Sequence, residues 1–442
     1  MVRAQFKDWI QKQVVRLQNS AIFKGFAITT IGSGLSKAIM IAATFWCTHS
    51  LSQEEFGEYS FINNTLVMVL TICASNFSRL CTKFAAEAKE SEDSIKRLFI
   101  LFLFSLTACL LSGLLILLLP DIILESVLGT TQMLKFLRFS ALLLPLFMLN
   151  PLIEGVLRGL MKFKIISLVQ IAAATIYFSS LIIGIKLSGL DGALVALLVY
   201  YTTFSVSFLI CLIRSTPSIL SFERFSGFKN QWRVLPTMII PIFVASFIEA
   251  PMFWIMQVML TKYSSVAAVG GMTIMKQVRN LALLIPNYFF NTYVAFAGKY
   301  NAEKNYKLYF SQFDRFIKYF LVIGILLFVL LSILNKPILW LYHPDYMTEW
   351  KSLIISSACI PFSLVLSLVR NDLIIQEHQR ALLIISILWN FIWIALFVSL
   401  ARLGIPSLES YFYSELCAIV LQLIICLGIY NRDKNTLLPV SK

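Results

Sequence analysis

Twelve long apolar segments constrain this chain of 442 residues more than any other feature of its sequence. A helix needs about 20 consecutive apolar residues to cross the hydrocarbon core of a bilayer. We expect such spans at residues 23–48, 58–80, 97–119, 139–158, 165–186, 190–213, 234–258, 266–296, 317–335, 352–370, 381–401 and 409–430. Lipid offers the backbone no hydrogen-bond partners, and helices satisfy their own. The sequence therefore predicts an all-α integral membrane protein.

The composition excludes whole classes of protein. Apolar residues make up 58% of the chain and charged residues 14%, whereas soluble domains run at about 45–50% and about 25%. These residues cannot build a water-facing surface, so we exclude a soluble enzyme and a nucleic-acid binder. The loops between the expected spans are short and leave no room for a separate catalytic domain.

The basic charges predict the orientation in the membrane. With the N-terminus in the cytoplasm, 26 of the 37 Lys and Arg residues fall on the cytoplasmic side and seven outside. This asymmetry follows the positive-inside rule, so we expect both termini in the cytoplasm and a multi-pass protein of the inner (plasma) membrane. Residues 1–22 are basic and amphipathic, which favours an interfacial helix over a signal peptide.

The second half of the chain resembles the first. At an offset of 213, Thr48 aligns with Thr261 and Gly57 with Gly270, and at 216 Pro145 aligns with Pro361. Six spans in each half would give two parallel bundles with a substrate path between them; the alternative is a chance similarity between apolar segments. We expect these domains: an N-terminal segment 1–22, a six-helix lobe 23–214, a cytoplasmic linker 215–233, a second lobe 234–431 and a tail 432–442.

Two charged residues lie near the middle of their expected spans. Lys37 is in span 1, and Glu249 is in span 7 beside the repeat counterpart of Lys37. Ionisable groups at this depth are costly and mark a partner or a cavity. Two readings stay open: an ion pair that only satisfies both charges, or a functional pair. In the functional reading Lys37 binds an anionic group of the cargo and Glu249 takes a coupling proton or sodium ion.

Span 8 carries a second polar group of residues. Their spacing places them along one helix face, and Pro286 lies midway and interrupts the hydrogen-bond ladder. The candidate substrate-binding residues on this face are Lys276, Arg279, Asn280, Asn287 and Asn291. We expect the face to line water, since lipid cannot solvate it, although snorkelling or structural hydrogen bonds to neighbouring helices remain alternatives.

Further charged residues lie at the ends of spans. Arg79 and Lys83 sit at the cytoplasmic end of span 2, where they snorkel or form a cytoplasmic entrance for cargo. Glu154 and Arg158 have i,i+4 spacing and should form an ion pair.

We expect Arg370 and Asp372, in the matching region of span 10, to form an ion pair likewise. The eight cysteines lack metal-binding spacing, so we expect them to pack as apolar residues. We expect no cofactor and no metal.

The charges at mid-depth favour an anionic cargo. Arg and Lys bind phosphates by charge-assisted hydrogen bonds that are stronger at low dielectric. A path for lipophilic cations would instead carry uncompensated carboxylates, and only Glu249 is central among the acidic residues of the spans.

Three short segments resemble a known family. LSQEEFGEYS at residues 51–60 resembles the leucine–small–x–x–x–Phe-Gly–x–Tyr signature of the polysaccharide-export flippases (Wzx-type). TKFAAE at 82–87 and GVLRGLMKFK at 155–164 resemble that family's end of span 2 and its loop between spans 4 and 5. Twelve spans in a 6+6 repeat are similar to the wider superfamily that includes the multidrug and toxic-compound extruders (MATE). One departure is Asn76, where Gly is more usual.

The resemblance implies a flippase, not an enzyme. It would move an undecaprenyl-pyrophosphate-linked oligosaccharide, the repeat unit of an O-antigen or capsule, from the cytoplasmic to the outer leaflet by alternating access. Its partners would be the lipid-linked oligosaccharide, bilayer lipids, a coupling proton or sodium ion, and glycan-assembly proteins. The alternatives are a MATE-like cation or drug antiporter and, less favoured by the short external loops, a membrane-embedded glycan polymerase or ligase.

Overall fold

Helices make up almost all of the computed structural model, which describes residues 21–88, 91–121, 131–215, 231–284, 286, 306–376 and 378–437. No strand occurs in these residues. In chain order the elements are α2 (Ala21–Ser50), α3 (Gln53–Cys73), η1 (Ser75–Phe77), α4 (Ser78–Glu87), α5 (Glu92–Leu118), α7 (Thr131–Phe147), α8 (Leu149–Gly159), α9 (Phe163–Ser215), η4 (Leu235–Ile239), α10 (Ile240–Tyr263), α11 (Val266–Ala282), α13 (Tyr306–Ile333), α14 (Asn335–Tyr342), η5 (Pro344–Glu349), α15 (Trp350–Ile375), α16 (Gln379–Arg402) and α17 (Ser407–Leu437).

The predicted spans coincide with these helices or cross a short break between two of them, wherever the chain is described. Residues 287–296, the end of the predicted eighth span, lie outside the described residues. Within the described part, eight helices are long and apolar enough to cross a membrane, or nine if the bent pair of α3 with η1–α4 counts as one. The all-α membrane fold is confirmed, and the number twelve stays a prediction.

The long element α9 shows how two spans can appear as one. Its 53 residues would make a straight helix of about 80 Å, far longer than the hydrocarbon core of about 30 Å. Ser188 and Gly189 leave helical geometry, and Gly189 has a φ of 56°. This position suits glycine because a side chain rarely adopts that φ. The chain turns back here, with Gly184 and Gly192 facing each other across the turn.

The described residues fall into two compact units. The first takes the described residues of Met1–Ser52 and of Ile62–Ala250, and the second those of Gln53–Phe61 and Pro251–Lys442. Most of the predicted linker, residues 216–230, lies outside the described residues, as do 1–20 and 438–442. The predicted lobe boundaries stay a prediction.

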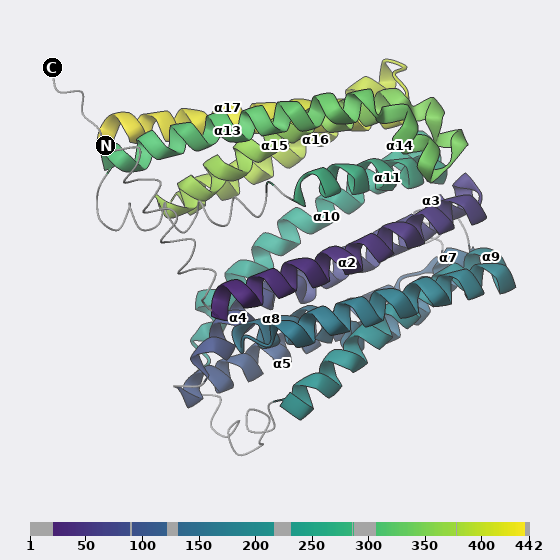
Figure 1. Cartoon of the computed structure of the whole chain (residues 1–442), viewed down its shortest axis with the longest axis horizontal. Coiled ribbons are helices and arrows are strands. Elements are labelled where there is room, and N and C mark those ends of the chain that lie inside the picture. The colour runs from purple at the N-terminus through teal and green to yellow at the C-terminus, as the bar shows by residue number, and fades with distance from the viewer. Residues whose placement is uncertain are drawn as a thin grey trace. The chain divides into compact units, whose positions relative to one another are not determined.

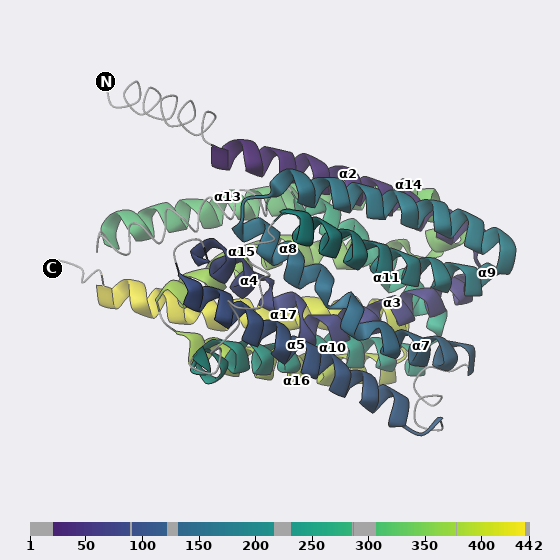
Figure 2. The same ribbon diagram turned by 90° about the horizontal axis from the view of Figure 1, so that it is seen from below.

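In the first unit, α2 runs along α9 (Figures 1 and 2). Gly32 allows the close approach, because a Cβ there would lie 2.3 Å from Cβ of Ser167. Two hydroxyls reinforce the contact: Ser33 donates to the side-chain oxygen of Gln170 at 2.8 Å and Ser36 donates to the Gln170 carbonyl at 3.0 Å. Small residues at such contacts are typical of membrane helices.

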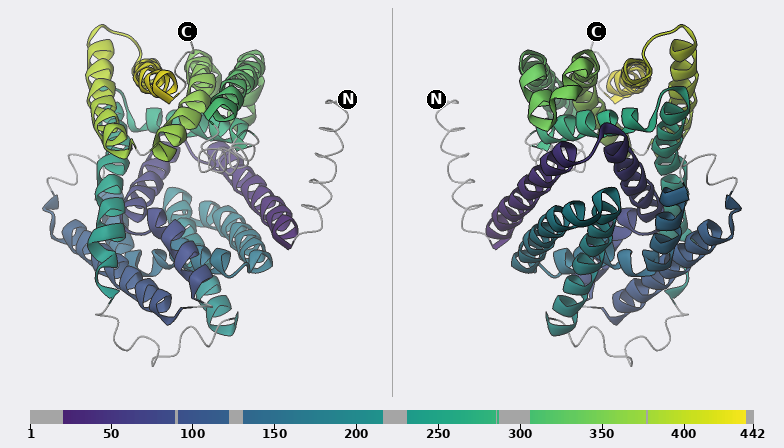
Figure 3. Two further views of the ribbon diagram at one scale, coloured as in Figure 1. Left: turned by 90° about the vertical axis from the view of Figure 1, so that its left-hand side faces the viewer. Right: turned by 90° about the vertical axis from the view of Figure 1, so that its right-hand side faces the viewer.

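In the second unit, α15 packs against both α13 and α17. Gly324 of α13 meets the backbone of Pro361 in α15, where an added Cβ would lie 2.5 Å from the Pro361 Cα. Seen end on in Figure 3, the yellow-green α16 and the yellow α17 lie next to each other. They are joined by a turn in which Gly404 has a φ of 81°.

Large apolar side chains cover much of the exposed surface. Leu118, Ile333 and Leu187 are exposed by 71%, 71% and 79%. Monomeric soluble proteins rarely expose extended apolar patches, whereas lipid-facing helices require them. The chain is a multi-pass membrane protein.

Candidate functional site

The side chain of Lys276 lies in an aromatic cage in the second unit. Its Nζ is 4.9 Å from the ring centroid of Phe253, 5.0 Å from that of Tyr411 and 5.9 Å from that of Trp393. It also donates a 2.5 Å hydrogen bond to the Tyr411 hydroxyl. Aromatic faces attract cations through the ring quadrupole, most strongly in a dry setting. The cage therefore holds the ammonium group without neutralising its charge.

The cage is assembled from four helices. Lys276 comes from α11, Phe253 from α10, Trp393 from α16 and Tyr411 from α17. Trp389, one turn before Trp393, packs against it with ring centroids 5.0 Å apart and the ring planes tilted by 35°. Neither indole N–H has a hydrogen-bond partner among the described residues, although both are buried. These two indole N–H groups are thus donors that the described part of the chain leaves without an acceptor.

Arg279, one turn beyond Lys276, forms a two-pronged ion pair with Glu415 of α17. Its Nη1 donates to Oε2 at 2.9 Å and its Nη2 donates to Oε1 at 2.7 Å. The two side chains are exposed by only 11% and 4%. A paired geometry of this kind is the strongest that Arg and a carboxylate adopt, and it compensates both charges in a setting where an unpaired one is costly.

These groups leave the cluster with a net positive charge. Lys276 and Arg279 carry two positive charges and Glu415 one negative charge, while Tyr411 and the other rings are neutral. We call these residues the cationic cluster: Lys276, Arg279, Glu415, Tyr411, Phe253 and Trp393. Because the described residues offer one carboxylate for these two half-buried cations, the cluster can accept an anion.

The other predicted residues of span 8 divide into two groups. Asn280 is exposed on α11, and Pro286 is buried beyond the end of that helix. Asn287 and Asn291 lie outside the described residues, so their role in binding cargo stays a prediction.

Lys37 and Glu249 are both exposed side chains of the first unit, on α2 and α10. Lys37 makes neither a hydrogen bond nor an ion pair with any residue that the structure describes. The purely structural Lys37–Glu249 ion pair is thus absent from this part of the chain. A role of Lys37 in binding cargo and of Glu249 in binding a coupling ion stays a prediction.

Arg79 and Lys83 are exposed on α4, where they follow the 43° bend between α3 and η1–α4. Their exposure fits either snorkelling or an entrance for cargo, so this role also stays a prediction.

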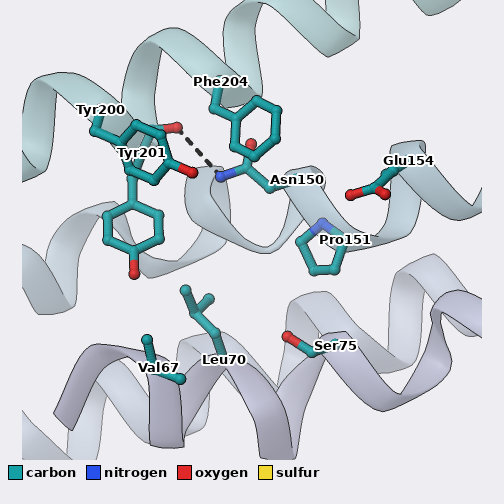
Figure 4. A pocket seen from close by; sticks show the side chains of 9 residues that line it. All are labelled: Val67, Leu70, Ser75, Asn150, Pro151, Glu154, Tyr200, Tyr201 and Phe204. Carbon is teal, nitrogen blue, oxygen red and sulfur yellow. Dashed lines mark hydrogen bonds between the residues drawn. The ribbon is translucent and has the colours of Figure 1, made fainter. Parts of the chain in front are cut away.

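The first unit contains a cavity of about 200 Å³ that the sequence did not indicate (Figure 4). Its lining combines apolar and polar side chains from α3, η1, α8 and α9. The lining residues are Val67, Leu70, Ser75, Asn150, Pro151, Glu154, Tyr200, Tyr201 and Phe204. None of the predicted site residues is among them.

A polar network fixes Glu154 at the edge of this cavity. Its Oε1 accepts hydrogen bonds from Arg158 at 2.5 Å and from Gln170 at 3.4 Å, and Gln170 in turn accepts from Ser33 on α2. The predicted Glu154–Arg158 ion pair is confirmed.

The predicted Arg370–Asp372 pair is wrong. The fully buried Asp372 instead accepts a hydrogen bond from Tyr309 of α13, because side chains two positions apart on a helix point to different sides. Among the described residues, no group of three or more His, Cys, Asp or Glu side chains is placed to hold a metal ion.

The sequence model of a family described as "Polysaccharide biosynthesis protein" matches residues 22–296, well over half of the chain. The chain belongs to this family. No protein with a curated description matches it. The resemblance of the three short segments to polysaccharide exporters is therefore confirmed.

Solved structures of transporters share the fold. The chain is 13% identical to a multidrug resistance MATE family transporter of the MOP superfamily in an inward-facing conformation, with a TM-score of 0.76 and coverage of 92% of this chain and 96% of that one. An outward-facing structure of a MATE family transporter is 15% identical, with a TM-score of 0.65 and coverage of 96% and 98%.

A MOP superfamily transporter from Pyrococcus furiosus, described as having a binding pocket of reverse polarity, is 14% identical with a TM-score of 0.65 and coverage of 96% and 98%. Identities this low show a common fold and leave the cargo open. The family and the fold are those of membrane transporters and flippases.

Proposed function

We propose that this protein is a flippase that moves an undecaprenyl-pyrophosphate-linked oligosaccharide from the cytoplasmic to the outer leaflet of the inner (plasma) membrane by alternating access. Both termini lie in the cytoplasm in this proposal, as the distribution of basic residues favours. The observation that carries it is the cationic cluster of the second unit, in which the half-buried Lys276 pairs with no carboxylate among the described residues.

The chemistry of the cluster favours a phosphate-bearing cargo. A buried net positive charge is stabilised by an anion, and Lys and Arg bind phosphate through short charge-assisted hydrogen bonds. Lipid-linked glycans carry their pyrophosphate between the lipid and the sugar. During transfer between leaflets, this charged group has to cross the membrane while the lipid tail stays in the bilayer. Asn280, Asn287 and Asn291 would bind glycan hydroxyls, and Lys37 would contact an acidic group of the cargo.

A MATE-like antiporter of cations is the second candidate, since the fold is that of MATE transporters. A cation site needs a carboxylate that is free to bind the cargo. In the second unit, however, both oxygens of Glu415 are occupied by Arg279. This alternative depends on Glu249 of the first unit, which we propose binds a coupling proton or sodium ion. It predicts that overexpression raises drug resistance and that Glu249→Gln lowers it.

The test uses purified protein in proteoliposomes that contain a lipid-linked pyrophosphate oligosaccharide. A membrane-impermeant lectin reports which leaflet holds the glycan. We expect wild-type protein to equilibrate the glycan lipid between leaflets and Lys276→Ala to slow this at least tenfold. The matched control is Lys336→Ala, which removes another lysine that lies over an aromatic ring, 5.8 Å from the centroid of Trp350 and outside the cluster. Unchanged leaflet accessibility with wild-type protein would refute the proposal, and lengthened glycans would instead indicate a polymerase.

A further inference from the structure

We propose that Glu415 is an internal counter-ion that occupies Arg279 while the carrier is empty and is replaced by the phosphate of the cargo when cargo binds. The inference rests on the proposed function and assigns a positioning role to a residue that touches Arg279 rather than the cargo. Glu415 lies within the span expected at residues 409–430, where the sequence alone gives it no partner.

The geometry makes Glu415 and a phosphate competitors for the same donors. Arg279 uses its Nη1 and Nη2 on the two carboxylate oxygens of Glu415, at 2.9 and 2.7 Å. Arg presents this planar pair of donors to carboxylates and phosphates alike. Each terminal nitrogen of Arg279 gives one of its N–H groups to Glu415, so a phosphate that takes this same two-pronged position has to displace the carboxylate. Lys276, in contrast, is held by a neutral hydroxyl and aromatic rings.

Charge balance requires that the carboxylate of Glu415 changes its protonation state when a phosphate displaces it from Arg279. Among the described residues, the groups that interact electrostatically with its carboxylate are Arg279 and Lys276 from α11, Tyr411 from its own helix and Cys359 from α15. With Glu415 ionised, the cluster offers one net positive charge to a pyrophosphate diester that carries two negative charges. A displaced carboxylate that stays in this dry setting without Arg279 is costly. It therefore takes up one proton, and the cluster then offers two positive charges.

This arrangement gives the carrier a reversible site. In the empty state the ion pair avoids the cost of an unpaired buried guanidinium. In the loaded state the return of Glu415 to Arg279 competes with the phosphate and promotes its release. Without a competing carboxylate, the two cations would hold the anion too tightly for rapid turnover.

Removal of the competitor should therefore tighten anion binding. The experiment measures the affinity of purified, full-length protein in detergent for inorganic pyrophosphate by titration calorimetry. We expect Glu415→Gln to bind pyrophosphate at least tenfold more tightly than wild type. Glu409→Gln, a glutamate on the same helix outside the cluster, is the matched control and should bind like wild type. Equal or weaker binding by folded Glu415→Gln overturns the counter-ion role.

The pH dependence separates this role from a merely structural one. Proton uptake by the displaced carboxylate makes wild-type binding tighten as pH falls, by at most about tenfold per pH unit for one proton. Glu415→Gln lacks this contribution, and comparing the two proteins removes the titration of pyrophosphate itself, which is common to both. Identical pH slopes contradict the proposal.

A second variant keeps the test decisive if Glu415→Gln does not fold. Glu415→Asp retains the charge on a shorter side chain that reaches Arg279 less well, so we expect an affinity between those of wild type and the Gln variant. Wild-type affinity in this variant overturns the role.

Tighter binding by Glu415→Gln without glycan flipping by wild type supports the counter-ion and refutes the proposed function. Flipping by wild type with unchanged binding by Glu415→Gln refutes only the counter-ion.

Discussion

Lys37 and Lys276 are both lysines of membrane helices, and the structure gives them opposite surroundings. Lys276 is enclosed by three aromatic rings and bound to Tyr411. Lys37 is exposed and has no ion pair or hydrogen bond with the residues described. Removal of each lysine should therefore affect stability differently, even where both changes lower transport.

For Lys37→Ala we expect a loss of glycan flipping with no loss of stability. The substitution breaks no internal contact of the described chain, and such exposed changes are usually within ±0.5 kcal/mol. Flipping in proteoliposomes and thermal unfolding in detergent are measured on the same preparation. Lys186→Ala, in the same unit and over the ring of Trp46, is the control. Full flipping activity of Lys37→Ala would remove Lys37 from the cargo path.

At the scale of elements, the sequence predicted what depends on neighbours in the chain and missed what depends on distant ones. The spans were predictable because hydropathy is local, and the Glu154–Arg158 pair because its spacing is one helical turn. The Arg279–Glu415 pair joins residues 136 positions apart. Its prediction requires knowing how α11 and α17 pack. The aromatic cage likewise depends on the packing of four helices. Asp372 accepts its hydrogen bond from Tyr309, which lies 63 positions away in the sequence.

The hairpin within α9 makes a prediction about helix packing. A Cβ at Gly192 would lie 1.8 Å from the Gly184 carbonyl oxygen, so Gly192→Ala forces the two arms of the hairpin apart. We expect a destabilisation of about 1–3 kcal/mol, as for other overpacked sites, measured as a lower unfolding temperature. Gly428→Ala in α17 has nothing within 4 Å of its new Cβ and should be neutral or stabilising by up to about 1 kcal/mol. Equal effects at the two positions would contradict the packing.

At the scale of the whole molecule, the proposed cargo makes transport electrogenic. A pyrophosphate diester carries two negative charges, and each elementary charge that crosses the membrane is worth about 2.3 kcal/mol per 100 mV. An inside-negative potential should therefore accelerate outward flipping, and an inside-positive potential should slow it. Potentials set by potassium gradients and valinomycin in proteoliposomes test this. A flipping rate that does not depend on the membrane potential would mean that cations move together with the cargo and neutralise its two negative charges.

The fold, the family and the cationic cluster together bear on a single question, the charge of the cargo. The most direct measurement places a lipid-linked pyrophosphate oligosaccharide and a lipophilic cationic dye in the same proteoliposomes with purified protein, and follows the leaflet of each. We predict that wild-type protein moves the glycan lipid and leaves the dye in place, and that Lys276→Ala moves neither. Transport of the dye without transport of the glycan lipid would contradict the account and favour the cation antiporter.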